Sequence, residues 1–406
     1  MVESENPTNR RRIVRYVLEG AAVLIIALLA SAVVALHLTR PPITYSQERV
    51  DIGETVQAQV EAVLETTESQ DEGGLYAVYQ RLQLRILSDG PHQGESVTVE
   101  YNGMGPTLDA VRFQEGARAL VMISDLPTGE NGEARTVYQV ADHMRLLPLG
   151  IAALIFALVA IVVGRWQGLR AIIGLAVSGV VIGVFIMPQI LAHRDPVLVT
   201  LVGTGLILAV TLYLIQGWNV PGHTALLGML ASLAVTALLA ILVTRLTFLT
   251  GFGSEETLFL QAVGVGVQMR GLLLAGIILG AAGVLDDVII AQVVAVFEVS
   301  AADTTLRFRD LYFSGMRIGV THLASMINTL VLAYASTALP LLILFYLYPE
   351  PWHLTINREL LAEEIVRTLV GSVGLMLAVP LTTAVAAWVA PLFGTPQPVT
   401  ATGIEG

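Results

Sequence analysis

The chain of 406 residues contains no cysteine, and its 22 basic residues are all arginine, without a single lysine. The absence of cysteine excludes disulfide bonds and thiolate metal sites. Charged residues are also scarce at 14%, whereas 54% of the residues are hydrophobic. A soluble domain is closer to ~45–50% apolar and ~25% charged. This composition indicates a protein with several membrane-spanning segments and a lipid bilayer as its surroundings.

The charge that is present is mostly acidic, with a net value of −11, and most of the excess lies between residues 40 and 145. An acidic segment repels the phosphate backbone, so we expect no nucleic-acid partner. The sequence has no zinc-binding His-x-x-x-His pair and no phosphate-binding loop. We therefore expect no cofactor, and the sequence assigns no metal ligands.

The first hydrophobic run extends from Tyr16 to Leu38 and follows a cluster of four arginines at positions 10, 11, 12 and 15. At about 23 residues it can cross a bilayer and exceeds the apolar core of a usual secretory signal. No small-residue cleavage site precedes the Arg40-Pro41-Pro42 stop. We predict an uncleaved transmembrane helix over residues 16–38, with residues 1–15 in the cytoplasm by the positive-inside rule.

Residues 43–145 have a different pattern, in which apolar and polar residues alternate along five short runs. Runs of period two, separated by Gly, Pro, Asn and Asp, are typical of antiparallel strands. Five strands in about 100 residues suit a small barrel, and we expect an OB-like one outside the cytoplasm. Because the segment is acidic, docking of a protein partner is a better expectation for it than binding of nucleic acid. The runs begin at Thr55, Tyr79, Ser96, Ala119 and Thr136.

Residues 147–391 are almost continuously apolar, and we predict seven transmembrane helices there, which makes eight with the first. Arginines that follow the predicted spans 147–164 and 271–297 favour loops in the cytoplasm at these two places. The tail of residues 392–406 is then cytoplasmic too. The protein is expected in the cell (inner) membrane, with both termini inside. The predicted spans cover residues 147–164, 169–190, 197–215, 224–243, 271–297, 318–346 and 365–389.

Two stretches do not fit a simple helix count. Residues 251–270 are too apolar for an open loop and too short to span, so we expect a re-entrant or interfacial segment. The run over 318–346 is too long for one upright helix. Pro340 should break or kink it, because proline removes a helical hydrogen bond.

The sixth predicted helix carries acidic residues in an apolar stretch. Asp286 and Asp287 lie well inside it, and Gln292 and Glu298 follow. A charge near the middle of such a helix costs at least ~2.5 kcal/mol, so it must face protein, water or an ion. Asp287 and Glu298 are about three turns apart and share a face, although Glu298 also suits a solvated helix end. Small residues in the same helix should let a neighbour approach closely, namely Gly276, Gly280 and Gly283.

The seventh predicted helix carries His322 and Asn328 together with several hydroxyl side chains. Interhelical hydrogen bonding explains the hydroxyls, whereas His322 and Asn328 are also candidates for function. Counted from helix entry at 271 and 317, Asp287 and His322 lie at a similar depth, about 6–7 Å from one membrane edge. We therefore predict a proton or ion pathway formed by Asp286, Asp287, Gln292, Glu298, His322 and Asn328.

These motifs resemble those of the YibE/F-like family of membrane proteins. The resemblance lies in the acidic segment 283–288, in residues 314–334 with 339–345, and in Val163-Gly-Arg-Trp-Gln-Gly-Leu-Arg, and it extends over about residues 50–390. It implies a small extracytoplasmic β-domain followed by a multi-helix membrane domain, without an established substrate. Val320 and Thr321 stand where the family is expected to have an Arg-Asp pair. The resemblance carries over to Asp287, Glu298, Gly315, Ile318, Gly319, Asn328 and Pro340, of which Gly315, Gly319 and Pro340 are taken as structural.

Two functions compete. The first is a transporter or channel, coupled to protons or cations through the carboxylates of the sixth helix, with an ion or small molecule as substrate. The second is an envelope-assembly or docking protein, whose β-domain binds an extracytoplasmic partner or whose chain binds a second copy. An enzyme is a weaker third, because His322 and Ser325 share one helix without evident oxyanion donors. A cavity at Asp287 would favour transport, and a dry helix contact would favour docking.

Overall fold

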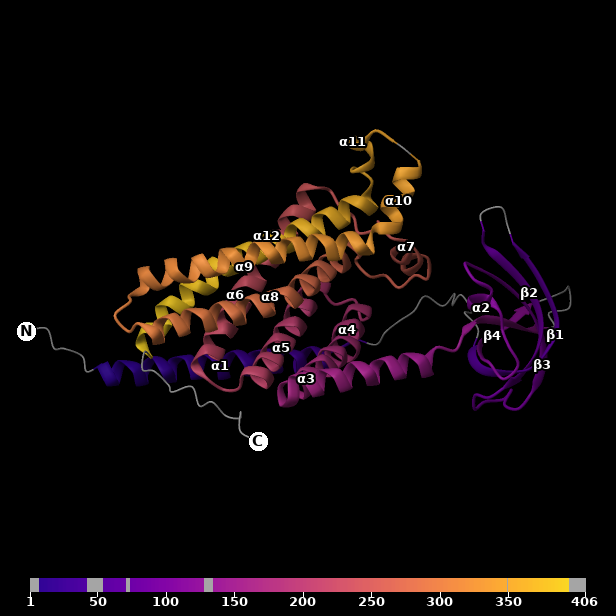
Figure 1. The fold of residues 1–406 in the computed structure, drawn as a ribbon, viewed down its shortest axis with the longest axis horizontal. Coiled ribbons are helices and arrows are strands. Elements are labelled where there is room, and N and C mark those ends of the chain that lie inside the picture. The colour runs from indigo at the N-terminus through magenta and orange to yellow at the C-terminus, as the bar shows by residue number, and fades with distance from the viewer. Residues whose placement is uncertain (1–6, 42–53, 71–73, 128–133, 349, 394–406) are drawn as a thin grey trace, which may run out of the picture. The chain divides into compact units, whose positions relative to one another are not determined.

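The computed structural model describes residues 7–41, 54–70, 74–127, 134–348 and 350–393. The chain divides into two compact units. One comprises Gln47–Val159, and the other comprises Met1–Ser46 together with Ala160–Gly406. Figure 1 shows the order of the elements along the chain.

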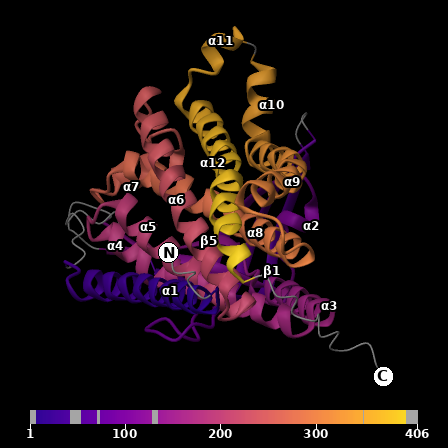
Figure 2. The ribbon, with the colours of Figure 1, turned by 90° about the vertical axis from the view of Figure 1, so that its left-hand side faces the viewer.

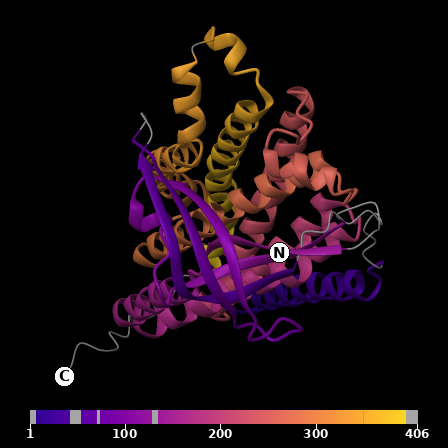
Figure 3. The same ribbon diagram turned by 90° about the vertical axis from the view of Figure 1, so that its right-hand side faces the viewer.

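The smaller unit is built on a five-stranded antiparallel sheet in the order β3-β2-β1-β4-β5. The edge strands β3 and β5 also contact each other, so the sheet curves into a nearly closed barrel (Figure 3). The short helix α2 (Leu108–Val111) joins β3 to β4. The prediction of a five-stranded barrel is confirmed, with one strand at each alternating run. The strands are β1 (Glu54–Gln70), β2 (Tyr76–Ile86), β3 (Ser96–Gly105), β4 (Arg118–Pro127) and β5 (Ala134–His143).

Alternation places one side of each strand inside the barrel, as β2 shows. Its residues at 78, 80, 82, 84 and 86 are all buried, although the second of these is a glutamine. The Gln80 amide is satisfied there, because it accepts from the Phe113 backbone N–H at 2.7 Å and donates to the Phe113 carbonyl at 3.0 Å. This buried pair ties the segment after α2 to the barrel wall.

The larger unit is helical. Helix α3 begins in the smaller unit, which ends at Val159, and continues into the larger unit. Among the described residues, seven helical stretches are long and apolar enough to cross a membrane. The length and composition of these helices are typical of a membrane protein. The helices are α1 (Pro7–Leu38), α3 (Leu146–Val180), a π-helical turn (Val181–Ile186), α4 (Met187–Leu191), α5 (Pro196–Gln216), α6 (Val220–Leu246), α7 (Glu255–Ala262), α8 (Met269–Ala302), α9 (Phe308–Thr337), α10 (Leu339–Leu347), α11 (Trp352–Thr355), α12 (Glu359–Val389) and a final 3-10 turn (Ala390–Leu392).

The predicted second and third spans lie in one continuous stretch of 46 residues, Leu146–Leu191. This stretch consists of two helices that meet at a kink, because Arg165 inside α3 has non-helical angles, with φ 51° and ψ −129°. The kink falls at the start of the predicted loop over residues 165–168. The described residues thus contain seven apolar stretches, one of which is kinked, and the exact number of spans stays a prediction.

The bundle is centred on α12, which packs against α6, α8 and α9 (Figure 2). Small residues make the closest of these contacts. A β-carbon added to Gly374 would lie 2.5 Å from the hydroxyl of Thr236, and one added to Gly228 would lie 2.9 Å from that of Thr382. Such close approach of backbones is the usual mode of helix association in membranes.

Two irregular regions of the sequence have defined structures. The helical run after residue 317 ends at Thr337, and α10 begins at Leu339 with Pro340 in its first turn, so the predicted break at Pro340 is confirmed. Residues 251–270 contain the eight-residue helix α7, which is too short to span. Their placement as a re-entrant segment remains a prediction.

Candidate functional site

The polar residues singled out by the sequence lie on α8 and α9, which are consecutive antiparallel helices. Residues 303–307 connect them, and the Asp303 carboxylate accepts hydrogen bonds from the backbone N–H and the hydroxyl of Thr305, at 2.9 and 2.6 Å. Helix α9 starts shortly after this turn, with Arg307 at its N-cap. The helix begins at Phe308, nine residues before the predicted entry at Arg317.

Gln292 forms the contact between the two helices. It is only 4% exposed, and its amide nitrogen donates to the Gly315 carbonyl at 2.8 Å and to the Thr383 hydroxyl at 2.7 Å. A β-carbon on Gly315 would lie 2.7 Å from Val296, and one on Gly319 would lie 2.7 Å from the Gln292 side-chain oxygen. Glycine is therefore required at both positions. The structure brings the predicted residues Gln292, Gly315 and Gly319 together into a dry, close contact.

The other predicted residues are not part of this contact. Asp287 and Glu298 are exposed on α8, and His322 and Asn328 are exposed on α9. Asp286 is half-buried, and one of its carboxylate oxygens is buried without a hydrogen-bond partner in the described part of the chain.

The predicted polar cluster of these acids with His322 and Asn328 is not formed within the chain. Across the described residues, no hydrogen bond or ion pair links Asp286 or Asp287 to either side chain. The physical reason is rotational, because inward-facing Gln292 turns the side chain at 287 outward on the same helix.

The depths of the acid and the imidazole nevertheless agree. Asp287 lies 15 residues before the end of α8, and His322 lies 14 residues after the start of α9. At ~1.5 Å per residue these positions are about 22 and 21 Å from the connecting turn. His322 thus lies farther along its helix than an entry at Arg317 implied, and it is level with Asp287 along the helix pair.

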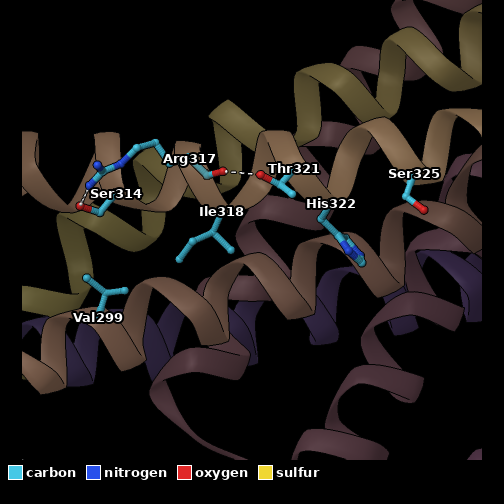
Figure 4. A pocket seen from close by; sticks show the side chains of 7 residues that line it. All are labelled: Val299, Ser314, Arg317, Ile318, Thr321, His322 and Ser325. Carbon is cyan, nitrogen blue, oxygen red and sulfur yellow. Dashed lines mark hydrogen bonds between the residues drawn. The ribbon is translucent and has the colours of Figure 1, made fainter.

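A groove of about 740 Å³ opens between α8 and α9 (Figure 4). Arg317 donates to the Ser314 hydroxyl at 3.3 Å, and Thr321 donates to the Arg317 carbonyl at 3.1 Å. Asp287 does not line the groove. In the described ranges, no group of three or more His, Asp or Glu side chains is placed to hold a metal ion. The groove is lined by Val299 of α8 and by Ser314, Arg317, Thr321, His322 and Ser325 of α9, among others.

A second polar contact was missed by the sequence analysis, which placed Glu359 and Glu363 in a loop before a helix starting at 365. In the structure α12 begins at Glu359. The Glu359 carboxylate accepts from the Thr250 and Gly251 backbone N–H groups at 2.5 and 2.9 Å, and Glu363 accepts from the Gly253 N–H at 3.1 Å. Carboxylates four residues apart on a helix, facing a glycine-containing loop, are the signal that identifies this contact.

The chain belongs to the YibE/F-like protein family, which matches residues 152–392. The match includes α5 to α12 and therefore the whole of the α8–α9 pair. The resemblance was expected from about residue 50, but the barrel lies before the matched residues. No curated protein and no solved structure matches the chain.

Proposed function

We propose that the protein is a membrane transporter or channel whose ion path follows the outer face of α8 and α9. The proposal rests on one observation. Four side chains are exposed on helices of membrane-spanning length and composition, namely Asp287, Glu298, Arg317 and His322. Placing an acid or arginine in lipid costs at least ~2.5 kcal/mol each, so this face is unsuited to contact with acyl chains. Water or a permeating ion along the face removes this cost.

The groove beside Arg317 and His322 supports the same proposal, since it provides space for water or a small ion next to titratable groups. Residues that bind and release protons or ions at membrane depth are the usual components of transport paths. Asp287, level with His322, is the acid that we assign to proton or cation coupling. The substrate class is therefore a proton or another small ion.

The test uses purified protein in liposomes, with proton uptake followed by an enclosed pH-sensitive dye under a potassium diffusion potential. We expect the wild-type protein to accelerate uptake and Asp287→Asn to lose most of that acceleration, because the substitution keeps the size and removes the charge. Glu115→Gln is the matched control, since it removes an exposed carboxylate in the barrel. Equal flux in Asp287→Asn and wild type would remove this acid from the mechanism.

Envelope assembly or partner docking is the second candidate function. The observation that favours it is the buried contact of Gln292 with Gly315 and Gly319, which joins α8 and α9 closely at this level. In that case the polar residues of the interface are structural. Liposomes that show no flux of protons, sodium or chloride with the wild-type protein would favour docking over transport.

We further propose that the barrel lies outside the cytoplasm of a cell (inner) membrane protein with both termini inside, and that it is OB-like. Arginines 10, 11, 12 and 15 before the first apolar helix support the orientation. A five-stranded, partly open barrel supports the OB-like assignment. Protease added to spheroplasts should cleave the barrel, and protection until the membrane is permeabilised would reverse the orientation.

A further inference from the structure

The outer side of the α8–α9 pair has no partner within the described chain, although it carries charge. On α8 the exposed positions follow one stripe, spaced three or four residues apart. A β-carbon added to Gly276 or Gly283 would meet no heavy atom within 4 Å, whereas one added to Gly280 would lie 3.2 Å from the Tyr334 hydroxyl of α9. Of the three glycines predicted to allow close helix approach, only Gly280 therefore has a near neighbour among the described residues. The stripe comprises Gly276, Gly280, Gly283, Asp287, Ala291, Val294 and Glu298.

The polar stripe of α9 faces the same way. The two helices meet at Gln292 and Gly315, and each residue advances the helix by about 100°. Asp287 and Glu298 are about 140° and 120° around α8 from Gln292, and both are exposed, as are Arg317, Thr321 and His322 on α9. The pair thus has one continuous outer face, which we call the α8–α9 face and define by Asp287, Ala291, Glu298, Arg317, Thr321 and His322.

The charges of this face complement each other by depth. Asp287 and His322 differ by about one residue of rise, or ~1.5 Å, in their distance from the connecting turn. Glu298 lies four residues from the turn and Arg317 nine, a difference of ~8 Å that a long arginine side chain largely bridges. Yet within one copy no ion pair joins any of these four side chains, as far as the chain is described.

We propose that a second copy of this chain covers the α8–α9 face and that the two copies form a twofold-symmetric dimer in the membrane. A twofold axis along the membrane normal keeps every residue at its own depth and brings the same patch of both copies together. Asp287 of one copy then meets His322 of the other, and Glu298 meets Arg317. The exposed glycines allow the backbones to approach closely enough for these pairs to form.

This inference goes beyond the proposed function and does not depend on it, because a dimer of this geometry serves either transport or docking. The natural absence of cysteine makes it directly testable. Ala291→Cys places one thiol on the face, and Leu238→Cys places one on α6, where the side chain is 67% exposed. With a bifunctional maleimide in native membranes, which joins thiols that are too far apart for a disulfide, we expect a cross-linked dimer at position 291 and none at 238.

Charge reversal tests the pairing itself. Arg317→Glu and Glu298→Arg, each expressed alone, place like charges against each other at both pairs of a symmetric dimer. Each should lower the fraction cross-linked through Cys at 291 by at least tenfold. Co-expressed with different tags, the two variants are complementary at both pairs, so cross-linking between the differently tagged chains should return. Misfolded chains would not recover in this way.

Several outcomes would overturn the proposal. One is the absence of a cross-link at 291, or cross-linking as strong at 238. Labelling of the 291 thiol by a hydrophilic maleimide without cross-linking would mean that a monomer exposes this face to water. A thiol that neither labels nor cross-links while the chain migrates in a mixed complex would mean that another protein covers the face. Failure of the mixed charge-reversed pair would place the charges elsewhere. None of these tests measures ion flux. A protein that does not transport ions would therefore not contradict the dimer.

Discussion

Gly319→Ala tests the contact on which the α8–α9–α12 packing depends. The new methyl group would lie 2.5 Å from a methyl carbon of Val379 and 2.7 Å from the Gln292 side-chain oxygen. Carbon atoms pack comfortably at ~3.5–4.0 Å, so α9 or its neighbours must move. Overpacking of this kind costs ~1–3 kcal/mol, and displacement of Gln292 weakens hydrogen bonds worth ~0.6 kcal/mol each in a membrane. The gain of ~1 kcal/mol from replacing a helical glycine offsets part of this cost. We expect a net loss of about 1–2 kcal/mol.

Gly179→Ala provides the matched comparison, because it makes the same change in α3 where nothing lies within 4 Å of the added carbon. That variant should gain up to ~1 kcal/mol. The two variants should therefore differ by ~2 kcal/mol or more, which corresponds to about 2–4 °C in the melting temperature measured in detergent. If Gly319→Ala melts at or above Gly179→Ala, the close contact of α9 with Gln292 and Val379 is incorrect.

Three further predictions concern the barrel and the loop held by α12. Gln80→Leu leaves the buried N–H and C=O of Phe113 unpaired, which costs ~1–3 kcal/mol for each group. Hydrogen exchange of the barrel strands should therefore accelerate at least tenfold, and unchanged protection would contradict the pairing. Burial lowers the pKa of His143. Below about pH 6.5 the unfolded chain therefore binds a proton at this histidine more readily than the folded barrel does, and the barrel becomes less stable as the pH falls. His143→Phe should therefore lose less strand protection than wild type between about pH 7.5 and about pH 5.5, and an equal loss would rule this histidine out. Glu359→Gln removes the charge that accepts from the Thr250 N–H and hydroxyl, at ~1.5–3 kcal/mol for charge-assisted bonds, so the Thr250 amide should exchange roughly tenfold faster or more. Exchange at the wild-type rate would show that the loop is held by other contacts.

Local properties of the sequence determined the elements of this protein. Apolar length predicts the membrane helices, because a bilayer requires about 20 residues of low polarity whatever their neighbours are. Alternation predicts all five strands, because successive side chains of a strand point to opposite faces. Pro340 predicts the break between α9 and α10, since its missing N–H is a property of that residue alone.

One helix start and the facing of the polar residues were decided by tertiary structure. The start of α12 at Glu359 accompanies hydrogen bonds to a loop more than 100 residues away in sequence. The start of α9 at Phe308 follows a local turn at Asp303 and Thr305, which the hydrophobic pattern did not reveal. The spacing of the polar residues of α8 likewise does not determine which of them points inward. Periodicity fixes their relative angles but not the absolute rotation of the helix about its axis.

That rotation is set by the close fit at Gly315 and Gly319, which accept Gln292 between α9 and α12 and leave no room for a side chain of their own. With Gln292 facing inward, Asp287 and Glu298 must face outward, since all three share one rigid helix. The sequence alone therefore determined that charged and polar groups lie within long apolar helices, with Asp287 and His322 at matching levels along the pair. Only the packing of α8, α9 and α12 decided that Gln292 is enclosed while the acids and His322 lie on the outer face.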